Sequence, residues 1–228
     1  MTSLIAASAV FLLIHFVVSG TRWRDALVAR LGERAYLGAF SFASLAILIW
    51  MGRAYARAPL IQLWGPLPGL RPLAFALIFI AFLFIVIGLA TVSPTRVGME
   101  GKLKEGADAA RGMGRITRHP FLWGVSLWAF VHLVVNGDLA AVILFGSLLL
   151  LGLGGGAMID AKRQRRFPDR WPKFSQATSN VPFAAIAAGR NQLRPALREI
   201  GVLRPAIAIA VYAIVFFFHG RLFGAPLS

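Results

Sequence analysis

The chain contains no cysteine, and this absence removes several kinds of site from consideration. Without a thiol there can be no disulfide, zinc–thiolate site, iron–sulfur cluster or covalent c-type haem attachment. Charged residues are also scarce, at 14% of 228 residues, whereas a soluble domain carries roughly a quarter. Only nine are Asp or Glu, and no pair of them has a spacing that suits acid–base catalysis. The sequence therefore does not indicate a hydrolase or an ATP-driven pump.

Long apolar segments are the main positive feature, since 58% of the residues are hydrophobic. Apolar stretches of about 18 or more residues are typical of membrane spans. We predict an all-α, polytopic membrane helix bundle, with the whole chain, 1–228, as a single transmembrane domain. No basic segment precedes the first stretch, so we expect a retained span there rather than a signal peptide. The six expected spans are residues 3–20, 35–51, 72–91, 121–135, 139–159 and 205–218.

The basic residues between these spans are distributed asymmetrically. Twenty of the 24 Lys and Arg fall in residues 21–34, 92–120 and 160–204, and four fall on the opposite side. Cytoplasmic loops of membrane proteins carry an excess of Lys and Arg, so we predict that these three segments are cytoplasmic and that both termini lie outside. The formal charge of +15 does not indicate nucleic-acid binding, because that would require a soluble basic domain.

Two of the connecting segments have recognisable patterns. Residues 160–204 begin with the charged sequence "DAKRQRRF" and continue through several prolines. We expect a helical extension followed by a cytoplasmic cap that lies on the membrane surface. The sequence "NGD" at 136–138 is typical of a tight turn, and Asp138 is a suitable N-cap for the helix that follows. Spans four and five should therefore form an antiparallel hairpin.

Two of the four histidines lie within predicted spans, His15 in span one and His132 in span four. Ionisable groups at this depth are costly and usually face the bundle interior. Each could be a packed histidine that is hydrogen-bonded to a neighbouring helix. Two such residues on different helices favour a second interpretation, in which both are axial ligands of a haem iron. At 1.5 Å per residue their depths differ by roughly 9 Å, so a shared haem would be strongly tilted.

A cluster of basic residues precedes span four. Arg115, Arg118 and His119 come directly before Pro120, a residue that suits the first turn of a helix. Basic side chains next to exposed helix N–H groups favour an anion, and we predict contact with a lipid phosphate or an acidic cofactor. The alternative is ordinary anchoring by cytoplasmic basic residues. His219, at the outer end of span six, is expected to be interfacial.

Six segments, taken in their order and spacing, form a specific pattern over nearly the whole chain. They are "HFVVSG" at 15–20, "RLGERAYLGAFSFASL" at 30–45, "QLWGPLPG" at 62–69, "RITRHPFLWG" at 115–124, "HLVVNGD" at 132–138 and "TSNVPFAAIAAGRNQL" at 178–193. In these segments the chain resembles the NnrU family, which also contains the 15-cis-zeta-carotene isomerases. The resemblance implies a multi-pass protein of the bacterial inner (cell) membrane, linked to denitrification and nitric oxide metabolism. The isomerase branch carries haem b, and its two haem-ligating histidines match His15 and His132.

The isomerase pattern includes further histidines that have no counterpart here. The position nineteen residues after His132 is Leu151, and residues 52–60 contain Arg53 and Arg57 but no histidine. We therefore favour a haem-b protein of the NnrU branch that acts in nitrogen-oxide redox metabolism with a redox or respiratory partner. The alternative is a haem-dependent enzyme that isomerises a double bond in a lipophilic substrate, either a carotenoid or another lipid.

A weaker resemblance concerns membrane methyltransferases of the isoprenylcysteine carboxyl methyltransferase type. The shared features are Arg118-His119-Pro120 and a charged helix from Asp160 that leads to Pro182. This resemblance implies S-adenosylmethionine-dependent methyl transfer, although the glutamate that the family uses near that cofactor has no counterpart after Asp160. A non-enzymatic alternative is a structural or assembly partner of a respiratory complex. All of these hypotheses involve contact with membrane lipids and none involves nucleic acid.

Overall fold

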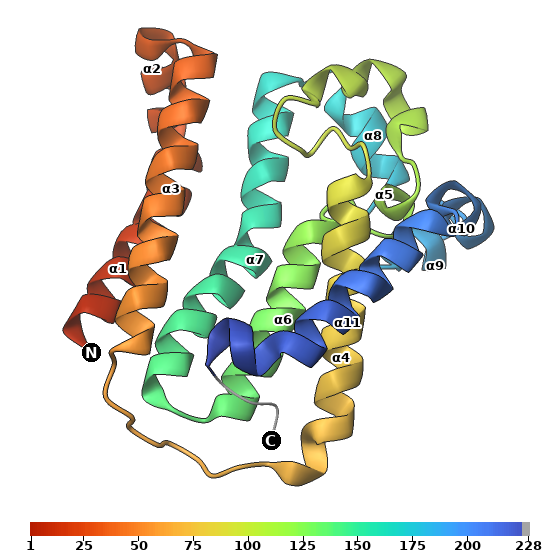
Figure 1. Cartoon of the computed structure of the whole chain (residues 1–228). Helices are drawn as coiled ribbons and strands as arrows, with labels where there is room; N and C mark the ends of the chain where they lie inside the picture. The colour runs from red at the N-terminus through yellow and green to blue at the C-terminus, as the bar shows by residue number, and fades with distance from the viewer. Residues whose placement is uncertain (225–228) are drawn as a thin grey trace. The chain divides into compact units, whose positions relative to one another are not determined.

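The computed structural model describes residues 1–224, and these residues form helices without any β-strand (Figure 1). The predicted all-α membrane bundle is confirmed, because every expected span falls on a helix. Five of these helices are long and apolar enough to cross a membrane, whereas the fourth expected span, α6, is shorter at 17 residues. The helices concerned are α1 (Thr2–Leu13) with its continuation η1 (Ile14–Ser19), α3 (Glu33–Ala56), α4 (Arg71–Ala90), α6 (Pro120–Asn136), α7 (Leu139–Arg166) and α11 (Leu203–Phe223).

The chain forms two compact units, which we call the N-terminal unit and the C-terminal unit. The N-terminal unit contains residues 1–74 and 129–162, and the C-terminal unit contains residues 75–128 and the chain from residue 163 onward. The boundaries fall within α4, α6 and α7, so each of these helices contributes residues to both units. A single transmembrane domain stays a prediction.

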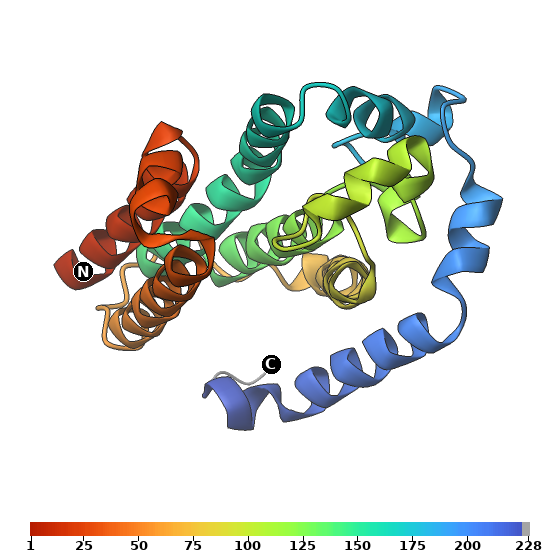
Figure 2. The same cartoon turned by 90° about the horizontal axis from the view of Figure 1, so that it is seen from above.

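In the N-terminal unit, α1 and α3 lie side by side (Figures 1 and 2). The buried side chains of Leu4 and Phe11 in α1 face Ala54 and Met51 in α3. Leu144 of α7 packs against both groups. Burial of such apolar side chains is the main favourable contribution to packing within the unit.

A short helix, α2 (Arg22–Leu31), connects η1 to α3. Its first turn is capped by the Thr21 hydroxyl, which accepts a hydrogen bond from the Trp23 amide at 3.3 Å. Arg24 is buried and forms an ion pair with Glu33, at 2.9 Å between Nη2 and Oε1. This pair ties α2 to the first turn of α3. Further along the chain a 3-10 turn, η2 (Pro68–Leu70), leads into α4.

The turn between α6 and α7 has the predicted structure. The Asp138 carboxylate accepts a hydrogen bond from the Ala141 amide at 2.9 Å, which confirms Asp138 as the N-cap of α7. Gly137 has a φ of +68°, and a Cβ built there would lie 2.6 Å from the Trp64 carbonyl oxygen, so glycine is required. The Trp64 indole also donates to the Val134 carbonyl at 2.8 Å. The segment that contains Trp64 therefore holds the end of α6 in place.

The C-terminal unit contains residues 163–204 of the predicted cap (160–204), and these pack against the segment that precedes α6. The helical extension is confirmed, since α7 continues to Arg166. The position of the cap on the membrane surface stays a prediction. The short elements of this unit are η3 (Glu100–Ala109), α5 (Met113–Ile116), α8 (Trp171–Ala177), α9 (Ala184–Ala187) and α10 (Leu193–Ile200).

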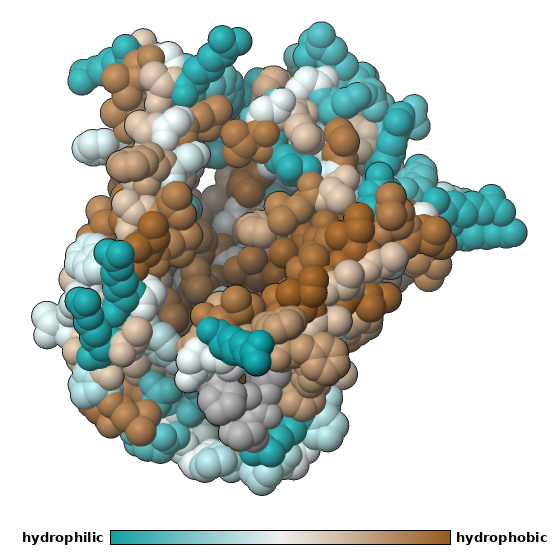
Figure 3. Space-filling model, viewed as in Figure 1, coloured by the Kyte–Doolittle hydropathy of each residue, from teal (hydrophilic) through white to brown (hydrophobic). Residues whose placement is uncertain are grey.

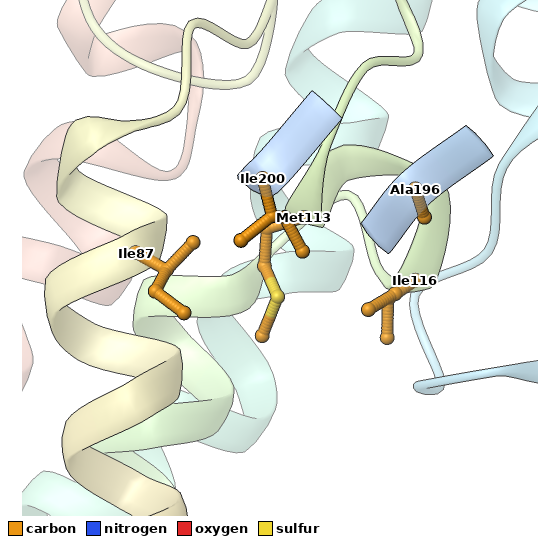
Figure 4. Packing of buried hydrophobic residues seen from close by; sticks show 5 residues of the cluster. All are labelled: Ile87, Met113, Ile116, Ala196 and Ile200. Carbon is orange, nitrogen blue, oxygen red and sulfur yellow. The ribbon is translucent and has the colours of Figure 1, made fainter. Parts of the chain in front are cut away.

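Two apolar clusters join these short elements. In the first, Ile87 of α4, Met113 and Ile116 of α5, and Ala196 and Ile200 of α10 gather around one another (Figure 4). The second joins η3 to α8, and its buried members are Leu103, Ala109, Ala110, Trp171 and Phe174. The cap is thus an integral part of the unit rather than a loose linker.

A buried arginine at the end of α7 adds polar contacts to this unit. Arg163 is only 2% exposed, and its guanidinium donates to the carbonyls of Pro94 and Arg96 at 3.1 and 3.2 Å. It also forms a 2.8 Å ion pair with Glu100. A buried charge is tolerable only with such partners, so Arg163 holds the segment after α4 against the base of the cap.

The surface of α11 is strongly apolar, as the brown residues along this helix show (Figure 3). The Phe217 side chain, for example, is 79% exposed. Soluble monomers rarely leave such a continuous apolar surface in contact with water. The apolar face of α11 is the one expected of a helix that contacts lipid.

Candidate functional site

His15 lies in an unusual stretch of backbone. Residues Ile14–Ser19 form a π-helix, a conformation that is rare and often found at functional sites. The His15 Nδ1 atom lies 2.8 Å from the carbonyl oxygen of Phe11. Because a carbonyl oxygen only accepts hydrogen bonds, Nδ1 carries the proton, and Nε2 of the neutral imidazole keeps its lone pair. This is the tautomer that a metal-ligating histidine adopts when its other nitrogen is held by the backbone.

Aromatic rings surround the His15 imidazole. The Phe11 ring lies 4.3 Å from it between centroids, and the Phe40 ring of α3 lies edge-on at 5.2 Å. Tyr36, one turn earlier in α3, stacks on Phe40 at 5.9 Å. These rings make the surroundings of His15 apolar and restrict the orientation of its side chain.

His132 lies in the part of α6 that belongs to the N-terminal unit and contacts α7. Its ring is 5.0 Å from that of Phe145, which is buried. Phe145 in turn makes an edge contact with Tyr55 of α3 at 5.9 Å. His132 is half-buried and is connected through these rings to both neighbouring helices.

The structure places His15 and His132 in the same unit but at different depths. Phe16, next to His15, packs so closely on α7 that a Cβ built on Gly154 would lie 3.0 Å from its ring. His132 contacts α7 at Phe145. These two positions of α7 are nine residues apart, about 14 Å along an ideal helix. The sequence predicts an offset in depth between His15 and His132 of roughly 9 Å, at 1.5 Å per helical residue.

The two histidines of this region have donor atoms of the kind that a haem iron accepts. They offer two imidazoles on different helices, one of which has its Nε2 lone pair available. Apolar aromatic rings line both positions, as a porphyrin would require. Among residues 1–224, no group of three or more His, Asp or Glu side chains forms an alternative metal site. Haem ligation by His15 and His132 stays a prediction. Imidazole nitrogens are suitable donors for it.

Arg115, the first residue of the predicted anion contact, is bound to a protein carboxylate. Its Nε and Nη2 atoms donate to the two carboxylate oxygens of Glu199 at 2.9 and 2.8 Å. Its Nη1 atom donates to the Asn191 side chain at 3.0 Å. The hydrogen bond with Arg115 lowers the pKa of Glu199 below its usual value, and the same bond raises the pKa of Arg115. Arg115 therefore joins α5 to α10.

Arg118 and His119 lie in the same unit as Arg115, and Pro120 begins α6 as predicted. The Arg118 guanidinium lies over the Trp171 ring at 5.8 Å, and its amide donates to the Ser179 carbonyl at 2.9 Å. His119 is buried, at 4% exposure. An anion contact at these residues stays a prediction. The observed partners show that Arg115 and Arg118 also have a structural role, because they join the segment before α6 to the cap.

Sequence reasoning did not single out the residues of the cap that complete this contact. The Asn180 carbonyl accepts hydrogen bonds from the Thr117 hydroxyl and from the Trp123 indole, the latter at 2.8 Å. The Ser179 hydroxyl accepts a hydrogen bond from the Ala185 amide at 2.9 Å. The segment "TSNVPF" was visible as a motif, but Thr117 and Trp123, the partners of Asn180, lie 63 and 57 residues earlier in the chain.

These features define the class of protein as a helical integral membrane protein with histidines inside its membrane-spanning part. The comparison with known families assigns the protein to one family within this class. The family model described as NnrU protein matches residues 3–227, nearly the whole chain. The protein belongs to the NnrU family.

Two curated relatives are plant enzymes. The chain is 28% identical over 222 residues to the chloroplastic 15-cis-zeta-carotene isomerase of Arabidopsis thaliana, an alignment that covers 95% of this chain and 59% of the relative. It is 26% identical over 229 residues to the enzyme of the same name from Zea mays, covering 96% of this chain and 58% of the relative. The chain thus spans a little under three fifths of the length of these relatives. No solved structure matches it significantly.

Proposed function

We propose that this protein isomerises a cis double bond of a carotenoid, or of a similar lipophilic polyene, with a haem b that is held by His15 and His132. Support comes from the two relatives, both of which are named 15-cis-zeta-carotene isomerase. The structural observation that carries the proposal is the His15 imidazole, which is oriented by the Phe11 carbonyl with its Nε2 lone pair available. His132 supplies a second imidazole in the same unit.

Bound haem would supply a redox-active iron next to an apolar substrate. The protein's own residues would orient and protect this group. The Phe11 carbonyl fixes the His15 tautomer, and the rings of Phe11 and Phe40 exclude water from one side. The Phe145 ring restricts His132. A polyene without charged groups needs no ionic recognition, which agrees with the apolar character of this unit.

A second candidate function is a role in denitrification or nitric oxide metabolism. It is favoured by membership of the NnrU family and by the lack of a histidine at Leu151 and within residues 52–60, where the isomerase pattern leads us to expect histidines. This candidate uses the same two histidines, because haem iron also binds nitric oxide as a ligand. The two functions therefore share a cofactor prediction and differ in substrate.

The cofactor can be tested with a visible spectrum of the protein purified in detergent after expression with added heme. We expect a haem-b spectrum in the wild type that is changed or lost in both His15→Ala and His132→Ala. His219→Ala is the matched control, because its imidazole packs on Phe223 in α11, within the C-terminal unit. Its spectrum should match the wild type. Unaltered spectra in both His15→Ala and His132→Ala, or no haem in the wild type, would overturn the proposal.

The substrate is tested separately, in a bacterial host that accumulates 15-cis-zeta-carotene and is grown in darkness. Expression of the wild type should lower the 15-cis fraction measured by chromatography, and neither His15→Ala nor His132→Ala should do so. If the wild type contains histidine-ligated haem but leaves the 15-cis fraction unchanged, isomerisation of this substrate is excluded. A shift of the haem spectrum on addition of nitric oxide would then support the second candidate.

A further inference from the structure

The C-terminal unit contains a polar cavity of about 470 Å³ that is separate from the histidines. It lies where the end of α4, the 3-10 helix η3 and the junction of α10 with α11 meet. Its charged lining consists of Lys102, Glu105, Arg111, Glu199 and Arg204. None of these residues takes part in the proposed haem site.

The carboxylates of this cavity are already occupied by protein donors. Both oxygens of Glu199 bind Arg115, and one also accepts the Gly112 amide at 2.6 Å. Glu105 forms ion pairs with Lys102 at 2.8 Å and with Arg111 at 3.4 Å. The hydrogen bond from Lys102 lowers the pKa of Glu105, so this group is ionised at neutral pH.

The charges of the cavity do not cancel. Three cations line it, Lys102, Arg111 and Arg204, and Arg115 stands behind Glu199. The three lining cations against the two lining carboxylates leave a balance of plus one. Arg204 is held in place by the end of α10, because its Nη1 donates to the carbonyls of Glu199 and Ile200 at 2.6 and 3.1 Å. The cavity therefore favours an anion.

Exposed apolar residues adjoin the charged lining of the cavity, and we call Val92, Val202 and Leu203 its apolar rim. Val92, which is part of the lining, follows directly on the apolar run of α4 and is 49% exposed. Val202 and Leu203, which come directly before the lining residue Arg204 in the chain, are 88% and 69% exposed. Such side chains are unfavourable in water and favourable against acyl chains. The cavity thus lies at the boundary between a charged surface and an apolar one.

We propose that this cavity binds the phosphate of an anionic phospholipid headgroup, with the acyl chains lying along the apolar rim. The phosphate contacts Lys102, Arg111 and Arg204, which supply charge-assisted hydrogen bonds. A soluble phosphate would use the same three cations but would make no use of Val92, Val202 and Leu203. The apolar rim is the reason for assigning the site to a lipid.

The test is native mass spectrometry of the detergent-purified full chain, with phosphatidylglycerol and phosphatidylcholine supplied in equal amounts. The wild type should retain phosphatidylglycerol preferentially. The double variant Lys102→Gln/Arg111→Gln should lose about fivefold in retention for each charge removed. Lys104→Gln/Arg198→Gln is the matched control, because it removes two nearby exposed charges that do not line the cavity. It should retain the lipid as the wild type does.

For a third variant we predict the opposite effect on retention of phosphatidylglycerol. Glu105→Gln removes a negative charge from the lining and should raise retention of phosphatidylglycerol, which a purely structural role for Glu105 would not do. Equal losses in the two double variants, or no preference for phosphatidylglycerol in the wild type, would overturn the proposal. Stabilisation by inorganic phosphate without lipid retention would replace the lipid with a soluble anion. The haem spectrum should stay unchanged in all these variants, which separates this test from that of the proposed function.

Discussion

Among single residues, Glu199 connects several parts of the C-terminal unit. It binds the Arg115 guanidinium through both carboxylate oxygens and accepts the Gly112 amide, 87 positions away in the sequence. Paired hydrogen bonds of this kind between arginine and carboxylate are stronger than bonds between neutral groups. Glu199 also lies next to Ile200, whose side chain belongs to the apolar cluster of this unit. Polar and apolar contacts therefore hold α10 at the same point.

The lowered pKa of Glu199 gives a prediction about pH. Because the folded-state pKa lies below the usual value, the stabilisation is present at neutral pH and is lost as the pH falls through the folded-state pKa. We expect Glu199→Gln to lower stability by about 1 kcal/mol at pH 7, given its partial exposure. Circular dichroism melts from pH 7 to pH 3 should show the difference between wild type and variant shrinking as the pH falls below the usual glutamate pKa. A difference that stays constant over this range would contradict the assignment.

At the scale of helices, close packing of α4 and α6 depends on glycine. A Cβ built on Gly124 would lie 2.6 Å from the Ile85 side chain and 2.8 Å from backbone atoms of Ala81 and Ile85. Backbone atoms cannot move aside as a flexible side chain can. Small residues at such contacts are the usual means by which helices approach one another within membranes.

Gly124→Ala should therefore be clearly destabilising. Overpacking of this kind costs about 1–3 kcal/mol, and we expect a lower melting temperature by circular dichroism in detergent. Gly52→Ala in α3 is the matched control, because a Cβ there would have no neighbour within 4 Å. Alanine has the better helix propensity, so this control should melt at or above the wild-type temperature. Equal changes in melting temperature for the two substitutions would show that the close contact between α4 and α6 at Gly124 does not determine stability.

At the scale of the whole molecule, the distribution of Lys and Arg decides the orientation that we propose for the membrane. Twenty of these residues lie in the three segments predicted to be cytoplasmic, and one of those segments forms the cap with α8, α9 and α10. A buried ion pair such as Arg163–Glu100 accounts for a single charge in this excess. Most of the others are exposed and available to a membrane surface.

Reporter fusions test this orientation. We expect a fusion near residue 175 to be active in the cytoplasm and a fusion after residue 220 to be active outside, because the excess of basic residues keeps the cap on the cytoplasmic side. Activity of alkaline phosphatase and of a cytoplasmic fluorescent protein at each site provides the measurement. The reverse pattern at both sites would invert the topology and place the polar cavity on the outer side.

Much of the architecture followed from the sequence alone. The helices at the expected spans, the turn at Gly137 with Asp138 as N-cap, and the extension of α7 to Arg166 were all predictable. These features depend on hydropathy, turn chemistry and helix caps, which are set by residues that are close in the sequence. His15 and His132 stood out for the same reason, because an ionisable residue in an apolar run is visible without a structure.

Only the tertiary structure decided which of these residues meet, and in what state. It showed that the backbone at His15 is a π-helix and that the Phe11 carbonyl fixes its tautomer. It also paired Arg115 with Glu199, a carboxylate 84 positions away that no local pattern connects to it. Contacts of this kind depend on how helices pack and on which buried polar groups need a partner. Local propensity carries no information about either, and so only the packed chain determines these pairs.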